Sequence, residues 1–291
     1  MSGESAFIDS LRAMAHHPAA RGLLDDAAVL EVGGEALVLT HDMLVEGVHF
    51  PSSADPADVA WKLVATNMSD LAAKGAEPLG VLLGFMLGED QPAFATGLQE
   101  VLEHFGVALL GGDTVSGGPP RAFGLTAIGR AAYRPVPSRG GARPGDGLWL
   151  TGELGAAMLG FEALRDATGA DSSAYRRPMA RLFEGWALAP VVTAMMDVSD
   201  GLLLDAWRLT QASGVSLAID GAAVPLATPA ERRLDALRWG DDYELLFTLP
   251  AGAEPPVPAT RIGRVEPSGF APLFLDGEPI VNSAGLGYQH G

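Results

Sequence analysis

Residues Asp58–Pro78 read DVAWKLVATNMSDLAAKGAEP. Apolar side chains recur at helical spacing over Asp58–Ala73, which predicts an amphipathic helix with one face against a core. The apolar run Val81–Leu87 follows closely and has the length of a strand. Asp70 lies on the predicted helix directly before Leu71, so we expect its carboxylate to be partly buried. A helix that leads directly into a strand indicates an α/β protein, and the acid on it marks a candidate site.

Helices and strands alternate on both sides of this segment. Alternating elements favour an α/β or α+β fold, and a length of 291 residues favours two domains. Arg134–Asp146 is rich in Pro, Gly and Arg and has no apolar periodicity, so we place the boundary there, with domains of residues 1–137 and 138–291. The predicted strands are Ala36–Thr40, Val81–Leu87, Val107–Leu110, Phe123–Ile128, Leu148–Thr151, Thr193–Met196, Val215–Ile219, Tyr243–Leu249 and Arg261–Val265. The predicted helices are Asp58–Ala73, Pro92–Phe105, Gly155–Ala167, Arg181–Thr193 and Leu202–Ala212.

The composition excludes several classes of function. With 36 acidic and 19 basic residues, the formal net charge is −17, which argues against binding of nucleic acid or of an anionic membrane through a basic surface. No apolar run reaches the roughly 18 residues of a membrane-spanning helix, and the stretch MSGESAFIDSLRAMAHH has no signal-peptide pattern. The chain has no Cys, so disulfides, iron–sulfur clusters, thiolate zinc sites and a cysteine nucleophile are excluded, and a cytoplasmic location is expected.

Aspartates follow three of the predicted strands directly. ALVLT is followed by His41-Asp42, VALL by two glycines and Asp113, and TAMM by Asp197. Open α/β sheets bind ligands in the crevice at the carboxyl ends of their strands, so we expect these carboxylates to meet there. An Asp in such a place can also be a turn former or a helix N-cap. Its recurrence at several element ends favours a binding site.

A carboxylate cluster of this kind needs a cation. Like charges repel one another, and burial makes each charge costlier. Lys occurs only at Lys62 and Lys74, so the expected filler is a divalent ion rather than a lysine. Oxygen ligands without any thiolate indicate Mg²⁺ rather than Zn²⁺, and Mg²⁺ in proteins usually also binds substrate phosphates. Asp26 and Asp70 are further candidate ligands of such an ion.

The motifs that usually bind phosphate or activate a nucleophile are absent from the sequence. There is no G-x-x-x-x-G-K-[ST] loop, no G-x-G-x-x-G, and no H-R-D or D-F-G. H-E-x-x-H and G-x-S-x-G are also missing, which argues against a zinc hydrolase and a serine hydrolase. Glycine turns such as Gly111-Gly112 could still bind phosphate through backbone N–H groups. His49 lies close enough to Asp42 in the chain to share its crevice, or else it is a packing or surface histidine.

Seven blocks of the sequence match a known family and occur in the family's order over nearly the whole chain. They are Leu24–Leu30 (LDDAAVL), Leu39–Phe50 (LTHDMLVEGVHF), Asp58–Pro78, Leu109–Thr114 (LLGGDT), Arg139–Asp146 (RGGARPGD), Met196–Asp205 (MDVSDGLLLD) and Gly240–Leu249 (GDDYELLFTL). With these blocks the sequence resembles the thiamine-monophosphate kinases of the aminoimidazole-ribonucleotide-synthetase-like superfamily. The resemblance implies an α/β (α+β) fold of two domains, with an N-terminal mixed-sheet domain that dimerises and a C-terminal α/β domain that completes the ATP and substrate site. It also implies ATP- and Mg²⁺-dependent phosphorylation of thiamine monophosphate to thiamine diphosphate by direct phosphoryl transfer.

The resemblance also implies roles for individual residues. The implied ligands of several Mg²⁺ ions are Asp26, Thr40, His41, Asp42, Asp70, Asp113, Asp197 and Asp200, with Thr40 and His41 acting partly through backbone oxygens. The residues implied to contact ATP are Gly112, Asp113, Arg139 and Ser199, and those implied to line the thiamine-phosphate site are His49, Asp241 and Tyr288. The implied catalytic set is Asp42, Asp70, Asp113 and Arg139. The implied partners are ATP and thiamine monophosphate, without nucleic acid or membrane, and a homodimer is expected.

Four positions depart from the family pattern. Leu24 stands where the family often has Gly, His41 where Thr is common, Lys74 where Met is frequent, and Asp241 in place of Glu. Two alternatives stay open: an ATP-dependent enzyme of the same superfamily with another acceptor, and a non-catalytic protein that binds a Mg²⁺–nucleotide complex. The number of Mg²⁺ ions is also open, as is the choice between the side chain and the backbone of His41 as a ligand.

Overall fold

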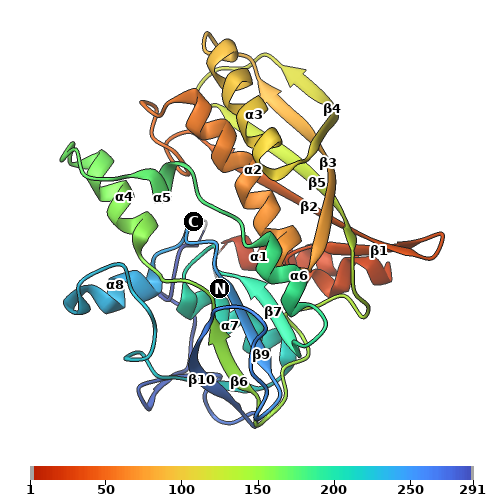
Figure 1. Cartoon of the computed structure of the whole chain (residues 1–291), viewed down its shortest axis with the longest axis vertical. Helices are drawn as coiled ribbons and strands as arrows, with labels where there is room; N and C mark the ends of the chain where they lie inside the picture. The colour runs from red at the N-terminus through yellow and green to blue at the C-terminus, as the bar shows by residue number, and fades with distance from the viewer. Residues whose placement is uncertain (1–2, 290–291) are drawn as a thin grey trace.

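Two mixed β-sheets, one in each half of the chain, organise the fold (Figure 1). The computed structural model describes residues 3–289. Helix α1 (Gly3–Arg12) and a short 3₁₀ helix, η1 (Pro18–Leu23), precede the first sheet. That sheet has the strand order β1-β2-β5-β3-β4, in which β3 and β4 run parallel and the other neighbours antiparallel. Its elements are β1 (Ala28–Val32), β2 (Glu35–Val45), α2 (Pro56–Ala73), β3 (Ala76–Met86), α3 (Gln91–Phe105), β4 (Ala108–Val115) and β5 (Ala122–Ala131).

The second sheet has the strand order β12-β11-β8-β10-β6-β9-β7. Its β8 and β11 run parallel, and the other neighbours run antiparallel. Residues 132–146 join the two sheets, and the predicted domain boundary lies inside this segment. The elements are β6 (Gly147–Leu150), α4 (Ala156–Arg165), α5 (Ser173–Arg176), α6 (Leu182–Leu188), β7 (Ala194–Asp197), α7 (Leu202–Ser213), β8 (Ser216–Ile219), η2 (Ala230–Arg232), α8 (Arg233–Arg238), β9 (Leu245–Leu249), β10 (Thr260–Glu266), β11 (Leu273–Leu275) and β12 (Glu278–Ile280). The expected α/β fold with mixed sheets is confirmed.

Helix α2 lies at the centre of the molecule, between the first sheet and the C-terminal half (Figure 1). Its N-cap is Asp55, whose carboxylate accepts a hydrogen bond from the backbone N of Ala57 at 2.9 Å, and Pro56 stands in its first turn. Fifteen of its 18 residues are buried, because α2 contacts α3, β2 and β5 as well as α5, α6 and β7. The prediction of a single buried face was therefore wrong, and the polar residues of α2 are held inside the protein. Neither α2 nor any other helix within residues 3–289 is long and apolar enough to span a membrane.

Each half has an apolar core, and a third cluster joins the halves. In the N-terminal half, Phe85 of β3, Phe94 of α3 and Phe123 of β5 pack together, with ring centroids 4.7, 5.0 and 5.2 Å apart. The third cluster contains Ala73 at the end of α2 and Phe247 of β9. Helix α2 is thus fixed against both halves, so side chains on it have defined positions relative to both.

The predicted strands correspond to β2–β10, but two aspartates lie inside strands rather than after them. Asp42 is part of β2 and Asp113 part of β4, whereas Asp197 is the last residue of β7. The β-sheet hydrogen bonds continue through both acids, because they are formed by the backbone. Asp42 is aligned with Leu125 of β5, and Asp113 with Gly84 of β3. The prediction that these two carboxylates follow the ends of their strands was wrong.

Smaller differences concern short or edge elements. Strands β1, β11 and β12 and helices α5 and α8 were not predicted; β11 and β12 have only three residues each. The predicted helix Arg181–Thr193 ends at Leu188 as α6, because Pro190 has no N–H to continue the helical hydrogen bonds.

The crossing of α2 and α3 depends on Gly97. A Cβ atom at Gly97 would lie 2.4 Å from the Cα and O atoms of Ala57 on α2. We expect Gly97→Val to lower the free energy of unfolding by about 3 kcal/mol, since backbone atoms cannot move aside cheaply. Urea unfolding measures this loss. Ala95→Val, at an exposed position of the same helix, is the matched control and should cost less than about 1 kcal/mol. Similar losses in the two variants would contradict a close helix crossing.

Candidate active site

Three carboxylates from distant parts of the chain meet beside α2. Asp26 precedes β1, Asp70 lies in the last turns of α2, and Asp197 ends β7. Each offers an oxygen atom within 4.8 Å of the oxygens of the other two. The structure thus brings together three of the acids that the sequence analysis expected at one site. Carboxylate oxygens at this spacing suit a hard divalent cation such as Mg²⁺.

The protein environment makes it costly for these acids to be charged together. Burial, together with the charges of Asp200 and Asp26, raises the pKa of Asp42 to about 6. Burial and the charge of Asp26 raise the pKa of Asp197 to about 8, although a hydrogen bond from the hydroxyl of Ser69, at 2.7 Å, opposes the rise. Burial and the neighbouring Asp42 and Asp197 raise the pKa of Asp70 well above its usual value. A divalent ion at the cluster would remove this cost, so the residues present fit Mg²⁺.

Asp26 already has basic partners from the chain itself. Nζ of Lys74 lies 2.5 Å from an oxygen of Asp26 and 2.5 Å from an oxygen of Asp25, and Nε of Arg139 donates to Asp26 at 2.6 Å. Burial would raise the pKa of Asp25, but the charges of Lys74 and Arg21 outweigh it and hold that pKa well below its usual range. The expectation of a divalent ion rather than a lysine beside these acids was therefore wrong at the Asp26 side. The sequence analysis named Lys74 as a departure from the family pattern but gave it no role, because its partners lie far away in the sequence.

The turn after β7 is held by an acid that the sequence analysis did not single out. Asp205, in the first turn of α7, accepts hydrogen bonds from the backbone N of Ser199 at 3.1 Å and of Asp200 at 3.0 Å. Arg208 then bridges Asp200 and Asp205, at 2.5 and 2.8 Å. The spacing of Asp205 and Arg208 on one helix face was a signal that could have been used. These contacts fix Ser199 and Asp200 beside Asp197.

Thr40 and His41 are neighbours in β2, but their side chains point to opposite faces of the sheet. The hydroxyl of Thr40 is buried toward α2 and donates a hydrogen bond to Asp70. The side chain of His41 is exposed on the other face, where its Nδ1 lies 2.9 Å from Oγ1 of Thr126. This alternation is the ordinary period of a strand. It leaves the backbone oxygen of His41 as the atom that can face the carboxylates.

Gly112 and Asp113 are not brought to the cluster within one chain. One row of aligned residues crosses four strands of the sheet and consists of Asp42, Leu125, Leu83 and Gly112. At the usual strand spacing, this row separates Gly112 from Asp42 by about 14 Å. Every residue of β4 is exposed. Asp113 is aligned with Met43, which is exposed on the face opposite α2, so the Asp113 side chain belongs to that outer face.

The three residues expected at the substrate site lie close together, and a buried lysine connects them. Nζ of Lys62 lies 2.7 Å from Asp241 and 3.3 Å from the backbone oxygen of His49, and it packs over the ring of Tyr175 at 3.9 Å. The ring of Tyr288 lies 6.4 Å from that of His49 in an edge-on arrangement. Lys62 is only 3% exposed. The sequence analysis assigned no role to Lys62, although a lysine within a largely apolar helix was a visible signal.

Both C-terminal members of this group are attached to the turn after β7. The backbone N of Asp241 donates to O of Ser199 at 2.8 Å, and that of Tyr288 donates to O of Asp200 at 2.9 Å. Gly240 permits this approach, because a Cβ there would lie 2.2 Å from the oxygen of Ser199. Asp241 itself has a φ of +65°, a left-handed conformation that costs energy for a residue other than Gly. The carboxylate cluster and the expected substrate residues thus share one scaffold.

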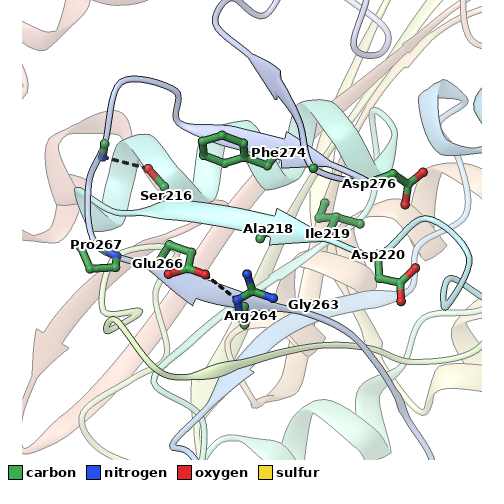
Figure 2. A pocket seen from close by; sticks show the side chains of 12 residues that line it. Ser216, Ala218, Ile219, Asp220, Gly263, Arg264, Glu266, Pro267, Phe274 and Asp276 are labelled. Atoms are coloured by element: carbon green, nitrogen blue, oxygen red, sulfur yellow. Dashed lines mark hydrogen bonds and ion pairs between the residues drawn. The ribbon is translucent and has the colours of Figure 1, made fainter.

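Two cavities differ in their relation to this scaffold. A cavity of about 280 Å³ is lined by Asp241 together with Asp242, Glu153 and other residues of the C-terminal half. A hollow of about 600 Å³ on β8, β10 and β11 is lined by none of the candidate site residues (Figure 2). In that hollow Arg264 pairs with Glu266, and the backbone N of Gly269 donates to Ser216 Oγ at 3.1 Å (Figure 2). The cavity at Asp241 therefore adjoins the candidate active site, and so does a third cavity, of about 610 Å³, whose lining includes Lys62 and Tyr175.

Comparisons with known proteins identify the family of this chain. The family models of AIR synthase related proteins match both halves: the N-terminal domain model matches residues 24–131 and the C-terminal domain model residues 143–270. The thiamine-monophosphate kinase of Caulobacter vibrioides is 38% identical, over 94% of this chain and 86% of the relative. That of Escherichia coli (strain K12) is 35% identical, over 92% and 91%. The solved structure of AaThiL complexed with AMPPCP and TMP has a TM-score of 0.86 at 30% identity, and covers 96% of this chain and 95% of that one. This chain belongs to the thiamine-monophosphate kinase family.

Proposed function

We propose that the chain transfers the terminal phosphoryl group of ATP to thiamine monophosphate, giving thiamine diphosphate and ADP. The observation that carries the proposal is the meeting of Asp26, Asp70 and Asp197 beside the group of His49, Asp241 and Tyr288. In the transfer, an oxygen of the substrate phosphate forms a bond to the terminal phosphorus of ATP while the bond to the ADP oxygen breaks. The attacking phosphate is already ionised, so no strong general base is required.

The carboxylates and the basic groups have different proposed roles: the carboxylates bind Mg²⁺, and Arg139 contacts the ATP phosphates. We propose that Asp42, Asp70 and Asp197 hold Mg²⁺, with Asp26, Asp200 and the backbone oxygens of Thr40 and His41 beside them. Mg²⁺, when bound, would neutralise the phosphate oxygens on which negative charge develops. Arg139 is placed next to Asp26 and can turn its guanidinium fork toward ATP phosphate, and Ser199 lies on the fixed turn after β7. The absence of a P-loop lysine is consistent with this arrangement.

We propose that the active enzyme is a homodimer joined through the outer faces of its N-terminal sheets. No helix of residues 3–289 covers that face, which exposes Met43 (52%) and Leu82 (39%), and the edge strand β4 exposes Leu109 and Val115. Exposed apolar surface of this kind is typical of an interface. A second copy on this face would place its Asp113 and Gly112 near the Asp42 strand, from which one chain keeps them apart. The proposal therefore accounts for how Asp113 and Gly112 contribute to an ATP site.

On the substrate side, the cavity at Asp241 suits thiamine, which carries a positive charge on its thiazolium ring. Four acids line this cavity together with two arginines, Arg177 and Arg181; the acids are Glu153, Asp241, Asp242 and Glu244. Lys62, the partner of Asp241, also donates to the backbone oxygen of His49. The rings of His49 and Tyr288 lie edge-on to each other. We propose that these residues orient thiamine monophosphate so that its phosphate faces the carboxylate cluster. The lack of cysteine fits the cytoplasmic location expected for such an enzyme.

A product assay tests the proposed function. Purified protein is incubated with ATP, Mg²⁺ and thiamine monophosphate, and ADP and thiamine diphosphate are quantified together. Equal amounts of both products are expected. ADP release with another phosphate or carbonyl acceptor, but not with thiamine monophosphate, would support a different superfamily activity. Binding of ATP without ADP formation on any acceptor would instead support a non-catalytic nucleotide-binding protein.

Lys62 is expected to set the affinity for thiamine monophosphate through Asp241. Lys62→Met removes the charged hydrogen bond and leaves the aliphatic stem in place, so we expect the KM for thiamine monophosphate to rise about 10-fold, the effect of roughly 1.4 kcal/mol. The KM for ATP should change little. Lys62→Arg should restore part of the loss, and Arg264→Met, which removes an exposed charge paired with Glu266, is the control. An unchanged KM for thiamine monophosphate in Lys62→Met would remove Lys62 from this role.

A further inference from the structure

Lys74 is a buried ammonium group placed at the rim of the carboxylate cluster. It is the residue that caps the C-terminus of α2, four positions after Asp70, and its side chain is 0% exposed. Its Nζ lies 2.5 Å from both Asp25 and Asp26, and it also donates to the backbone oxygen of Met195 in β7 at 3.3 Å. A positive charge at this end of a helix is favourable in itself. The ammonium therefore ties together the loop before β1, the end of α2 and the strand that carries Asp197.

The basic groups of the chain are distributed unevenly over the cluster. Asp25 and Asp26 together have three cationic partners, namely Lys74, Arg21 and Arg139. Within residues 3–289, no Lys or Arg forms an ion pair with Asp42, Asp70 or Asp197. Hydroxyl groups of Thr40 and Ser69 are the side-chain hydrogen-bond donors to Asp70 and Asp197. One side of the cluster is thus neutralised by the protein, and the other side is left to an external cation.

We propose that Lys74 is a built-in cation of the active site, which takes the place of one divalent ion at the Asp25–Asp26 side. A divalent ion bound between Asp26 and Lys74 would meet the ammonium at close range, and the repulsion between them excludes it. The ions that the chain does bind are then held mainly by Asp42, Asp70 and Asp197. This inference rests on the proposed binding of divalent ions and specifies the side of the cluster at which none of them is held.

A purely structural salt bridge would have other consequences. It would stabilise the fold to the same extent whether or not divalent ions are present, and its removal would not create a new ion site. A built-in cation is replaceable: when it is removed, Asp25 and Asp26 become two adjacent buried carboxylates, which attract a divalent ion. The number of bound ions, and the dependence of stability on them, separate the two possibilities.

The test counts Mn²⁺ ions by electron paramagnetic resonance titration and measures the melting temperature in EDTA and in Mn²⁺. We expect Lys74→Met to bind one more Mn²⁺ than the parent. In EDTA its melting temperature should fall by roughly 10 °C, and Mn²⁺ should restore most of this loss. Lys74→Arg keeps the charge and should bind the parental number of ions. Arg165→Met, which removes a charge far from the cluster in an exposed pair, should match the parent in both measurements.

Each outcome of this test is decisive. Equal, non-zero numbers of Mn²⁺ in the parent and Lys74→Met would overturn the inference and leave the proposed function standing. Absence of Mn²⁺ binding in every protein would instead refute the proposed metal site itself. Folding of Lys74→Met only in the presence of Mn²⁺ would support the inference. If Lys74→Met fails to fold in either condition, Lys74→Gln is measured in its place, and failure of Mn²⁺ to recover that variant also overturns the inference.

Discussion

Asp70→Asn is expected to lower turnover about 1,000-fold, which corresponds to roughly 4 kcal/mol of lost transition-state stabilisation. The charge of Asp70 is opposed by burial and by three neighbouring acids, Asp42, Asp197 and Asp26. In the proposed site this charge would bind a divalent cation together with the phosphates of ATP. Asn has the same shape and can still accept the hydrogen bond from Thr40, so the substitution removes the charge and leaves the packing unchanged. Steady-state production of thiamine diphosphate measures the effect.

The stability of the same variant should change in the opposite direction. In EDTA the raised pKa values mean that the folded protein binds more protons than the unfolded chain between pH 3.8 and about 8, so stability falls as pH rises through this window. Asp70→Asn removes one of these groups, and its melting temperature in EDTA at pH 8 should equal or exceed that of the parent. Asp166→Asn, an exposed acid outside the site, should leave both turnover and stability unchanged. Parental turnover in Asp70→Asn would exclude Asp70 from metal binding.

The part of the site that was predictable from the sequence is the part set by local pattern. The helical spacing in Asp58–Ala73 and the apolar strand that follows it predicted α2 and β3, and Asp70 on α2 does lie at the cluster. The recurrence of acids near strands β2, β4 and β7 predicted that Asp42, Asp113 and Asp197 share a site, whereas the acids whose oxygens lie within 4.8 Å of one another are Asp26, Asp70 and Asp197. These features depend on periodicity and on residue type, and both are visible in one sequence.

The sequence did not reveal the contact of Lys74 with Asp26 or the direction of the Asp113 side chain, because both depend on packing between residues that are far apart in the chain. Lys74 and Asp26 are far apart in the chain, and their contact exists only because the end of α2 packs against the loop before β1. Asp113 was expected in the same crevice as Asp42, because a strand was expected to stop before each acid. Both strands continue through the acid, so the alternation of faces sends Asp113 to the outer side of the sheet. Side-chain direction on a strand thus decided which acids meet within one chain.

Mixing two inactive variants is expected to restore about a quarter of the parental turnover, if Asp113 acts in the site of the other subunit. Asp70→Asn and Asp113→Asn should each be inactive alone. In a dimer with one subunit of each kind, one site combines both substitutions, whereas the other combines an intact Asp70 with an intact Asp113. Random exchange puts about half of the molecules in mixed dimers, each with one intact site of two. The measurement is turnover after the two proteins are unfolded and refolded together.

The control for this experiment prevents the subunits from meeting. Leu82 is exposed near the centre of the outer face and is aligned with Thr126 and His41 across the sheet. Leu82→Asp places a carboxylate in an apolar interface, twice in a symmetric dimer, so it should give monomers in sedimentation and abolish the restoration. Leu234→Asp, equally exposed on α8, should do neither. Recovery of turnover that persists with Leu82→Asp monomers, or no recovery between dimeric variants, would place Asp113 outside a shared site. If turnover is restored in dimers and lost with Leu82→Asp, the outer face of the N-terminal sheet is the interface, and it brings Asp113 of one subunit to the Asp42 strand of the other.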